Sequence, residues 1–180
     1  MKKYEFTGEV KRIKLIGTEV VLRRIRAVTA FGVVKAGDIG GWIEKEENLS
    51  HDGSAWVYGD ARVYGNARVY GNAKVYGDAW VYGNAKVCGN AEVYGDAEVY
   101  SVNHIFSIGP IGSRNEYTTF YRNKNEKIEV RCGCFNGIIE EFLEKVAETH
   151  GENKHASVYR AAAEIAKLQS EPLSTDEEAE

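Results

Sequence analysis

The sequence predicts a mainly β protein built around a parallel β-solenoid, because its central part repeats every six residues. Eight consecutive hexads run from Gly53 to Tyr100 with the pattern Gly-(Asn/Asp/Ser)-Ala-x-Val-Tyr, in which Cys88 replaces one Tyr. Ala and Val stand two residues apart, so they share one face of a short strand. Gly followed by Asn or Asp suits a corner, since these residues tolerate positive φ. Three sides close a triangle, so the hexads predict about three coils of eighteen residues, with Ala and Val packed inside.

The predicted elements follow in chain order. Residues 1–50 form an N-terminal β cap, because a solenoid has open sheet edges that need covering. KYEFTGE, KRIKLI and EVVLRRIRAV are expected as strands, and GDIGGWIE as the entry to the first coil. Six basic residues mark this cap, either as a solvated strand face or as an anion or nucleic-acid patch: Lys11, Arg12, Lys14, Arg23, Arg24 and Arg26.

The solenoid is expected over residues 51–111, because Ile105 and Ile111 continue the Val slot. Residues 112–169 are expected to form a hairpin and two helices. YTTFYR and KIEVRC flank the turn NKNE, and IIEEFLEKVAETH places its apolar residues on one helical face that ends at Gly151. An Ala-rich helix follows from about Lys154 to Gln169, and residues 170–180 form a disordered acidic tail.

Composition narrows the class of protein. The chain has 180 residues and a formal charge of −4, but five acids lie in the last eleven residues, so the remainder carries about +1. This balance makes nucleic-acid binding an unlikely function. No apolar run is long enough to span a membrane, and the start lacks a signal peptide. Three cysteines are too few for a disulfide scaffold, so a cytoplasmic location is expected.

The hexads resemble the hexapeptide-repeat, left-handed β-helix family, strictly over residues 53–100 and more loosely over residues 43–111. This resemblance implies left-handed winding and assembly as a homotrimer. The chain also resembles small proteins encoded by bacteria, phages and prophages. The motifs that carry this resemblance are LRRIRA, GDIGGWIEKEENLS, the tandem GNAxVY units and the ending IGSRN…TFYR…CGCFNG…EEF…HG. That narrower resemblance implies a host-cytoplasm setting and no established catalytic residue.

Outward-facing aromatic residues predict an oligomer interface, because monomers seldom expose a large apolar surface. The alternative is that they form ladders between coils of one chain. The residues are Tyr58, Tyr64, Tyr70, Tyr76, Tyr82, Tyr94, Tyr100 and Phe106. A column of Asp60, Asp78 and Asp96 along one corner is expected to be solvated, with a bridging cation as the alternative.

The segment GPIGSRN is the main candidate for a ligand site. Backbone N–H groups around its glycines can form an anion nest, and Arg114 can bind a phosphate or carboxylate. The predicted ligand-binding residues are Gly112, Ser113, Arg114, Asn115, Arg122 and Arg131. The alternative is a tight exit turn from the solenoid, with Arg114 paired to a structural carboxylate.

Two further groups of side chains are candidates for metal binding or catalysis. Cys132 and Cys134 are expected on one strand face as packing thiols, because zinc would need two more ligands of recognised spacing. His104 occupies an outward slot, and in the acyltransferase branch of the hexapeptide family a histidine acts as general base. It could do so here only beside a cofactor groove. We therefore predict no catalytic residue, no metal and no cofactor.

The sequence thus predicts a non-enzymatic oligomeric binding protein of phage type. It would hold a small anionic ligand, with a nucleotide as one candidate, or a host protein, and could act in counter-defence by sequestering either. The alternatives are a structural or virion accessory module, and an acyltransferase that uses His104.

Overall fold

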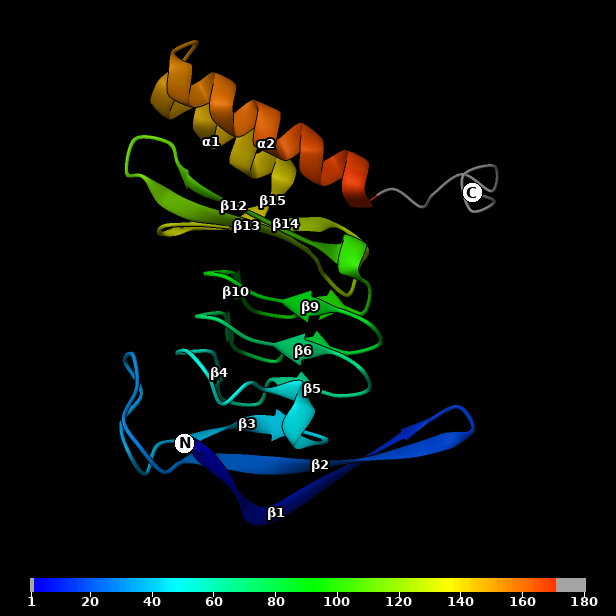
Figure 1. The fold of residues 1–180 in the computed structure, drawn as a ribbon. Coiled ribbons are helices and arrows are strands. Elements are labelled where there is room, and N and C mark those ends of the chain that lie inside the picture. Colours follow the sequence, from blue (N-terminus) through cyan, green and yellow to red (C-terminus); the bar gives the residue numbers. More distant parts are fainter. Residues whose placement is uncertain (1, 171–180) are drawn as a thin grey trace, which may run out of the picture.

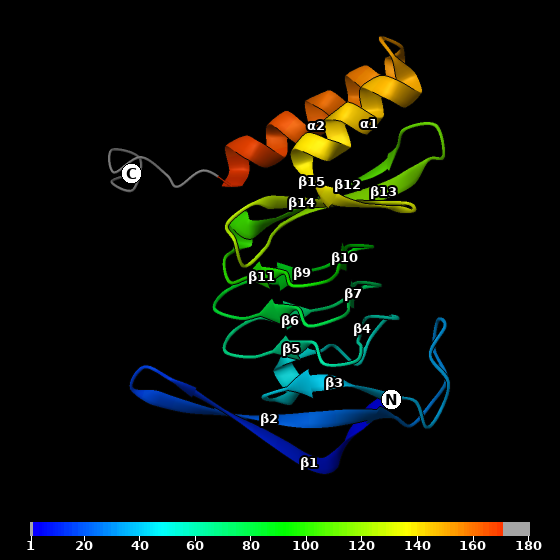
Figure 2. The same cartoon turned by 180° about the vertical axis from the view of Figure 1, so that it is seen from behind.

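A computed structural model describes residues 2–170 and consists of three stacked parts (Figure 1, Figure 2). An N-terminal β-ribbon lies at one end, the solenoid lies in the middle, and a four-stranded sheet covered by two helices lies at the other end. This confirms the predicted fold class. The predicted acidic tail lies outside the described residues from position 171 onward.

The solenoid contains eight two-residue strands, one for each hexad. They are β4 (Trp56–Val57), β5 (Arg62–Val63), β6 (Arg68–Val69), β7 (Lys74–Val75), β8 (Trp80–Val81), β9 (Lys86–Val87), β10 (Glu92–Val93) and β11 (Glu98–Val99). Strands eighteen residues apart pair in parallel, as in Arg62 with Trp80, which gives the sheets β5-β8-β11, β4-β7-β10 and β6-β9. Every Ala and Val of the hexads is at most 1% exposed. The interior is therefore filled by alternating small and branched side chains, as predicted.

The N-terminal part extends one face of the solenoid. It contains β1 (Tyr4–Leu15), β2 (Thr18–Ala27), β3 (Ile39–Ile43) and the 3₁₀-helix η1 (Glu46–Asn48). β1 is one strand where two were expected, because a register shift between Phe6 and Val10 carries it through Gly8. β3 already pairs in parallel with β5, through Trp42 and Ile43. The parallel pairing of the solenoid therefore begins at β3, inside the predicted cap of residues 1–50 and in the segment expected as the entry to the first coil.

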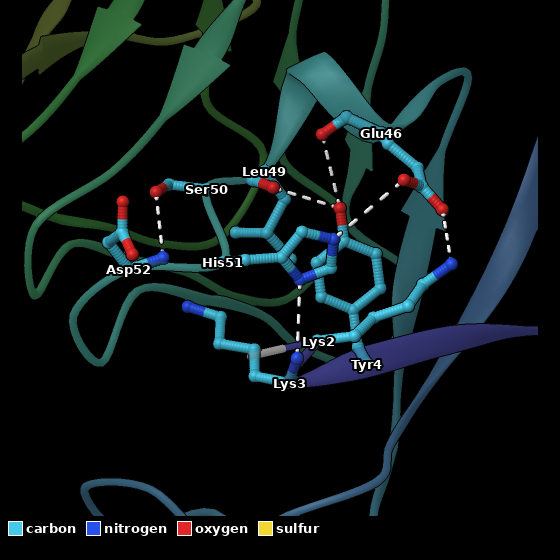
Figure 3. A network of polar contacts seen from close by, with 8 residues as sticks. All are labelled: Lys2, Lys3, Tyr4, Glu46, Leu49, Ser50, His51 and Asp52. Atoms are coloured by element: carbon cyan, nitrogen blue, oxygen red, sulfur yellow. Dashed lines mark hydrogen bonds and ion pairs between the residues drawn. The ribbon is translucent and has the colours of Figure 1, made fainter.

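A buried polar network closes the first coil (Figure 3). The Tyr4 hydroxyl donates to the carbonyl oxygens of Glu46 at 3.1 Å and Leu49 at 2.8 Å, and the His51 ring stacks on Tyr4 at 4.3 Å. The Lys3 ammonium donates to the Ala55 carbonyl at 2.8 Å. Burial lowers the pKa of Lys3 to about 8. These side chains satisfy carbonyls at the end of the solenoid that no further coil can reach.

The C-terminal unit consists of a sheet and two helices. Its elements are the 3₁₀-helix η2 (Val102–His104), β12 (Ile105–Ile111), β13 (Glu116–Arg122), β14 (Ile128–Cys132), β15 (Phe135–Ile138), α1 (Ile139–His150) and α2 (Lys154–Ser170). The hairpin and both helices confirm the predictions. β12, however, pairs antiparallel with β13 rather than forming a further coil. The parallel coils end near Tyr100, before the predicted boundary at residue 111.

The C-terminal sheet lies between the helices and the last coil (Figure 1). Along β13, successive side chains point alternately toward the helices and toward the last coil of the solenoid. Phe120 packs with residues of both helices, whereas Tyr121 joins the core of the solenoid. Both are 1% exposed. This alternation fixes which residues of the sheet face each side.

Candidate anion-binding site

Two hairpin turns lie side by side at one end of the C-terminal sheet. Residues 112–115 join β12 to β13, and Gly133 and Cys134 join β14 to β15. The Arg114 Nη1 lies 4.0 Å from the Cys134 sulfur. Cys132 pairs with Phe135 across the second turn, in which Gly133 has φ +58°. The expectation that Cys132 and Cys134 share a strand face was therefore wrong, because the chain reverses between them.

A cavity of about 420 Å³ opens beside these turns on the helix side of the sheet. Its apolar wall includes Phe135, Phe142 and Tyr159, and the Phe142 and Tyr159 rings meet edge to face at 5.5 Å. Arg114 and two residues of α1, Lys145 and His150, line the same cavity. Cationic and aromatic groups thus surround one space, which suits an organic anion with an apolar part.

Arg114 makes no ion pair with any residue from 2 to 170, although the acidic residue Glu116 also lines the cavity. Arg131 differs, because its Nε lies 3.4 Å from a Glu92 carboxylate oxygen, and Lys74 contacts the same carboxylate at 3.0 Å. The described residues therefore contain no ion pair of the kind that the alternative required, between Arg114 and a structural carboxylate. Its guanidinium remains available to a ligand.

The structure brings together only part of the predicted ligand-binding set. Ser113 and Arg114 line the cavity, but Gly112 packs under Tyr159, where an added Cβ would lie 1.7 Å from the phenol oxygen. Asn115 occupies the turn with φ +51° and does not line this cavity. Gly112 and Asn115 therefore shape the turn and are not part of the cavity lining.

Arg122 does not join Arg114, because Arg114 lies in the turn before β13 and Arg122 is the last residue of that strand. Its Nη2 pairs with Glu126 at 2.7 Å, and its Nη1 lies 3.2 Å from His104 Nε2. The hairpin therefore does not bring Arg122 to the other members of the predicted ligand-binding set. A strand of this length separates its ends by roughly 20 Å.

A second cavity of about 570 Å³ lies on the solenoid side of the same sheet. It shares Arg114, Glu116, Gly133 and Cys134 with the first cavity. Its other lining residues come from the sheet and from the last coil: Asn90, Glu92, Tyr117, Thr119 and Arg131. The Glu92 backbone N–H donates to the Thr119 hydroxyl at 3.1 Å, which holds the sheet against the coil.

Sequence reasoning missed the contributions of the solenoid and of α1. Asn90 and Glu92 occupy ordinary hexad slots, so nothing local distinguishes them from their equivalents in other coils. Lys145, Thr149 and His150 recur at helical spacing beside the apolar face of α1. That spacing could have indicated a polar rim next to the core.

Tyr159 serves the cavity as a neutral hydroxyl. Burial, followed by the neighbouring Cys132, raises the pKa of Tyr159 to about 12. Its oxygen lies 3.8 Å from the Cys132 sulfur, which also accepts a hydrogen bond from Thr118 at 3.2 Å. Within residues 2–170, no three His, Cys, Asp or Glu side chains are placed to hold a metal ion.

His104 is enclosed between the solenoid and the C-terminal unit. It is 8% exposed, the Tyr100 ring meets it edge to face at 4.2 Å, and Arg122 contacts its Nε2. Burial, together with the adjacent Arg122 charge, lowers the pKa of His104. It lines neither cavity, and the slot that the repeat predicted to face outward is covered by Arg122 of the C-terminal unit.

The tyrosines form ladders between coils of one chain. Tyr58 stacks on Tyr76 at 4.6 Å, and Tyr64 stacks on Tyr82 at 5.0 Å. Tyr64 is 5% exposed, because it packs with Leu22 and Trp42, so it has little surface to offer a second copy. More than a third of the surface is exposed in three members of the predicted interface: Tyr70, Tyr94 and Tyr100. The homo-oligomer stays a prediction.

Two other columns differ from the simple repeat. Phe106 lies on β12 and stacks on Phe120 at 5.9 Å, so it belongs to the C-terminal core and not to a solenoid face. In the aspartate column, Lys11 contacts Asp60 at 3.4 Å and Lys124 contacts Asp96 at 2.8 Å. Lysines of the two flanking parts thus relieve the repulsion along this corner.

None of the helices in the described residues is long and apolar enough to cross a bilayer.

The fold defines a β-solenoid repeat protein, and comparison with known proteins specifies the repeat. Residues 55–71 and 67–83 match the YdcK β-solenoid repeat. The chain is also 39% identical over 62 residues to the Escherichia coli (strain K12) protein "Uncharacterized acetyltransferase YdcK". This similarity covers 32% of the chain and spans 19% of the length of that relative. The chain therefore carries a YdcK-type solenoid and is distantly related to a protein with that name.

Proposed function

We propose that the protein is a non-enzymatic binding protein whose C-terminal unit holds a small organic anion. The observation that carries this proposal is the guanidinium of Arg114, which has no ion pair within residues 2–170 and borders a cavity with aromatic walls. Ligand sites are typically hollows of this size with apolar walls and a few placed polar groups. An anion bound there would receive charge-assisted hydrogen bonds.

The surroundings define the chemical class of the ligand. Phe135, Phe142 and Tyr159 favour an aromatic or apolar group, and Lys145 adds a second positive charge at the rim. Glu116 lines the same space and disfavours a ligand with many negative charges. A nucleoside monophosphate or an aromatic carboxylate satisfies these conditions.

The test is calorimetric titration of the full chain with adenosine monophosphate and with benzoate. We expect Arg114→Ala to weaken binding by about ten- to a hundred-fold, the usual effect of removing a hydrogen bond to a charged group. Arg12→Ala is the matched control, because Arg12 is exposed and pairs with Glu19 on the distant ribbon. Equal affinity of the Arg114→Ala variant, or no binding of a panel of nucleotides and aromatic carboxylates, would overturn the proposal.

Native mass spectrometry of the same samples tests the biological side of the proposal. In a phage setting, capture of a nucleotide signal in the host cytoplasm would serve counter-defence, and a homotrimer is the expected assembly. A bound mass that disappears in Arg114→Ala supports capture. Co-purifying host protein without such a mass favours protein binding, and association with virions favours a structural role. A monomer contradicts assembly through the exposed tyrosines.

Acyl transfer is a second candidate, favoured by the similarity to a protein named as an acetyltransferase. The burial of His104 and its contact with Arg122 count against that histidine as the base. Acetyl transfer from acetyl-coenzyme A that is lost in His104→Ala would replace the binding proposal with this one.

A further inference from the structure

The two cavities meet at the tips of the hairpins, where Arg114 borders both. The C-terminal sheet separates them elsewhere, since Phe120 faces the helices and Thr119 faces the solenoid. A ligand that reaches from one cavity into the other must therefore pass over the rim formed by residues 112–115 and the Gly133–Cys134 turn. The group at the bend of the ligand would lie beside the Arg114 guanidinium, which has no ion pair within residues 2–170.

The two cavities differ in chemical character. The first has the aromatic wall already described, whereas the second is lined by the polar side chains of Asn90, Glu92 and Thr119. Tyr117 adds one aromatic ring that is 41% exposed. This ring lies against Gly109, where an added Cβ would be 2.8 Å from it, so the absence of a side chain makes room for the ring.

Asn90 stands at the open end of an amide ladder. The Ser54 hydroxyl donates to Asn72 Oδ1 at 2.8 Å, and Asn72 Nδ2 donates to Asn90 Oδ1 at 3.1 Å. The ladder uses the oxygen of Asn90, while its Nδ2 has no partner within residues 2–170. A hydrogen-bond donor is thus left at the edge of the second cavity.

Charge limits the ligand to one anionic group near the rim. Arg131 is neutralised by Glu92, and Glu116 adds a further carboxylate to the second cavity. A chain of phosphates that extended from Arg114 into this cavity would meet an arginine already paired with Glu92, and the Glu116 carboxylate would repel it. The carboxylates of Glu92 and Glu116 would instead accept hydrogen bonds from donor groups such as sugar hydroxyls.

We propose that the ligand consists of two nucleosides joined by one phosphodiester, with the phosphate on Arg114. One base occupies the aromatic cavity, and the second nucleoside lies against Tyr117 and Asn90. This inference rests on the proposed function and extends it from an anion to a ligand class. A phosphodiester carries one negative charge and bends freely, and bases stack on aromatic rings irrespective of sequence.

The test compares the 3′,5′-linked dinucleotide of adenosine with adenosine monophosphate by calorimetry on the full chain. We expect the dinucleotide to bind at least about tenfold more tightly, because one further base is stacked. Asn90→Ala and Tyr117→Ala should each remove most of this advantage and leave the affinity for the mononucleotide unchanged. Thermal melting of each variant verifies that it is folded.

Each variant has a matched control on another face of the solenoid. Asn84 fills the same hexad slot as Asn90 and accepts the equivalent ladder bond from Asn66, but it lines neither cavity. Tyr70 is 39% exposed, close to the value for Tyr117, and also lies outside both cavities. Asn84→Ala and Tyr70→Ala should leave both affinities unchanged.

Three results would overturn the inference. Equal affinities for the two ligands, both lost in Arg114→Ala, would remove the two-nucleoside ligand and leave the proposed function intact. An advantage of the dinucleotide that survives both Asn90→Ala and Tyr117→Ala would place its second half elsewhere. A ten-nucleotide strand that binds tenfold more tightly than the dinucleotide would identify a nucleic-acid strand as the source. If the wild-type protein binds none of these ligands, the proposed function itself is overturned.

Discussion

Glu92→Gln is predicted to lower stability and raise anion affinity at the same time. The Glu92 carboxylate accepts from Lys74 at 3.0 Å and Arg131 at 3.4 Å, and all three side chains are about 30% exposed. Partly exposed pairs contribute about 0.2–1 kcal/mol each. The glutamine amide oxygen keeps part of the hydrogen bonding, so we expect the free energy of unfolding to fall by about 1 kcal/mol.

The effect on binding has the opposite sign. Arg131 and Arg114 line the same cavity, so the removal of the carboxylate leaves the Arg131 charge uncompensated next to a bound anion. A unit charge about one Debye length away, roughly 8–10 Å at physiological salt, contributes on the order of 1 kcal/mol in partly exposed surroundings after screening. The affinity for adenosine monophosphate should therefore rise about fivefold, and less at high salt.

Urea denaturation and calorimetric titration measure the two effects independently. Glu98→Gln is the control, because Glu98 fills the same hexad slot but accepts its hydrogen bond from Tyr82 at 2.6 Å, away from both cavities. It should leave the affinity unchanged. A Glu92→Gln protein that is destabilised but binds the anion no more tightly than wild type would refute the view that Glu92 neutralises the site.

Two further predictions concern the solenoid and the tyrosines. Gly83 and Gly89 share one hexad slot with φ +59° and +65°, yet an added Cβ lies 2.3 Å from the Tyr100 carbonyl at Gly83 and meets nothing within 4 Å at Gly89. Gly89→Ala should cost about 1–2 kcal/mol of left-handed strain, and Gly83→Ala clearly more; equal urea midpoints would contradict this. Burial raises the pKa of Tyr64 and Tyr159 to about 12, so the stability that each phenol contributes is present below pH 10 and lost as the pH rises from 10 through 12. Each loss amounts to roughly 3 kcal/mol. Absorbance at 295 nm should rise together with unfolding followed by circular dichroism, and complete tyrosine ionisation in folded protein would contradict the reasoning.

The sequence alone determined the interior of the solenoid and the local elements of the C-terminal unit. Ala and Val two residues apart can only face the same side of a strand, and Gly at every sixth residue leaves no other regular structure. The hairpin around NKNE and the helix that ends at Gly151 carry their signals within a few residues. Periodicity and turn chemistry are local properties, so they can be read without the fold.

Only the tertiary structure decided where the repeat ends and which residues form the candidate site. Ile105 keeps the six-residue period, but β12 pairs antiparallel with β13, because pairing depends on the partner strand and not on spacing. Arg114 and Arg122 look equivalent in sequence, yet one lies in the turn before β13 and the other at the far end of that strand. Asn90 joins the site only because the C-terminal sheet packs on the last coil. Such contacts arise from the packing of distant segments, and a local pattern carries no record of them.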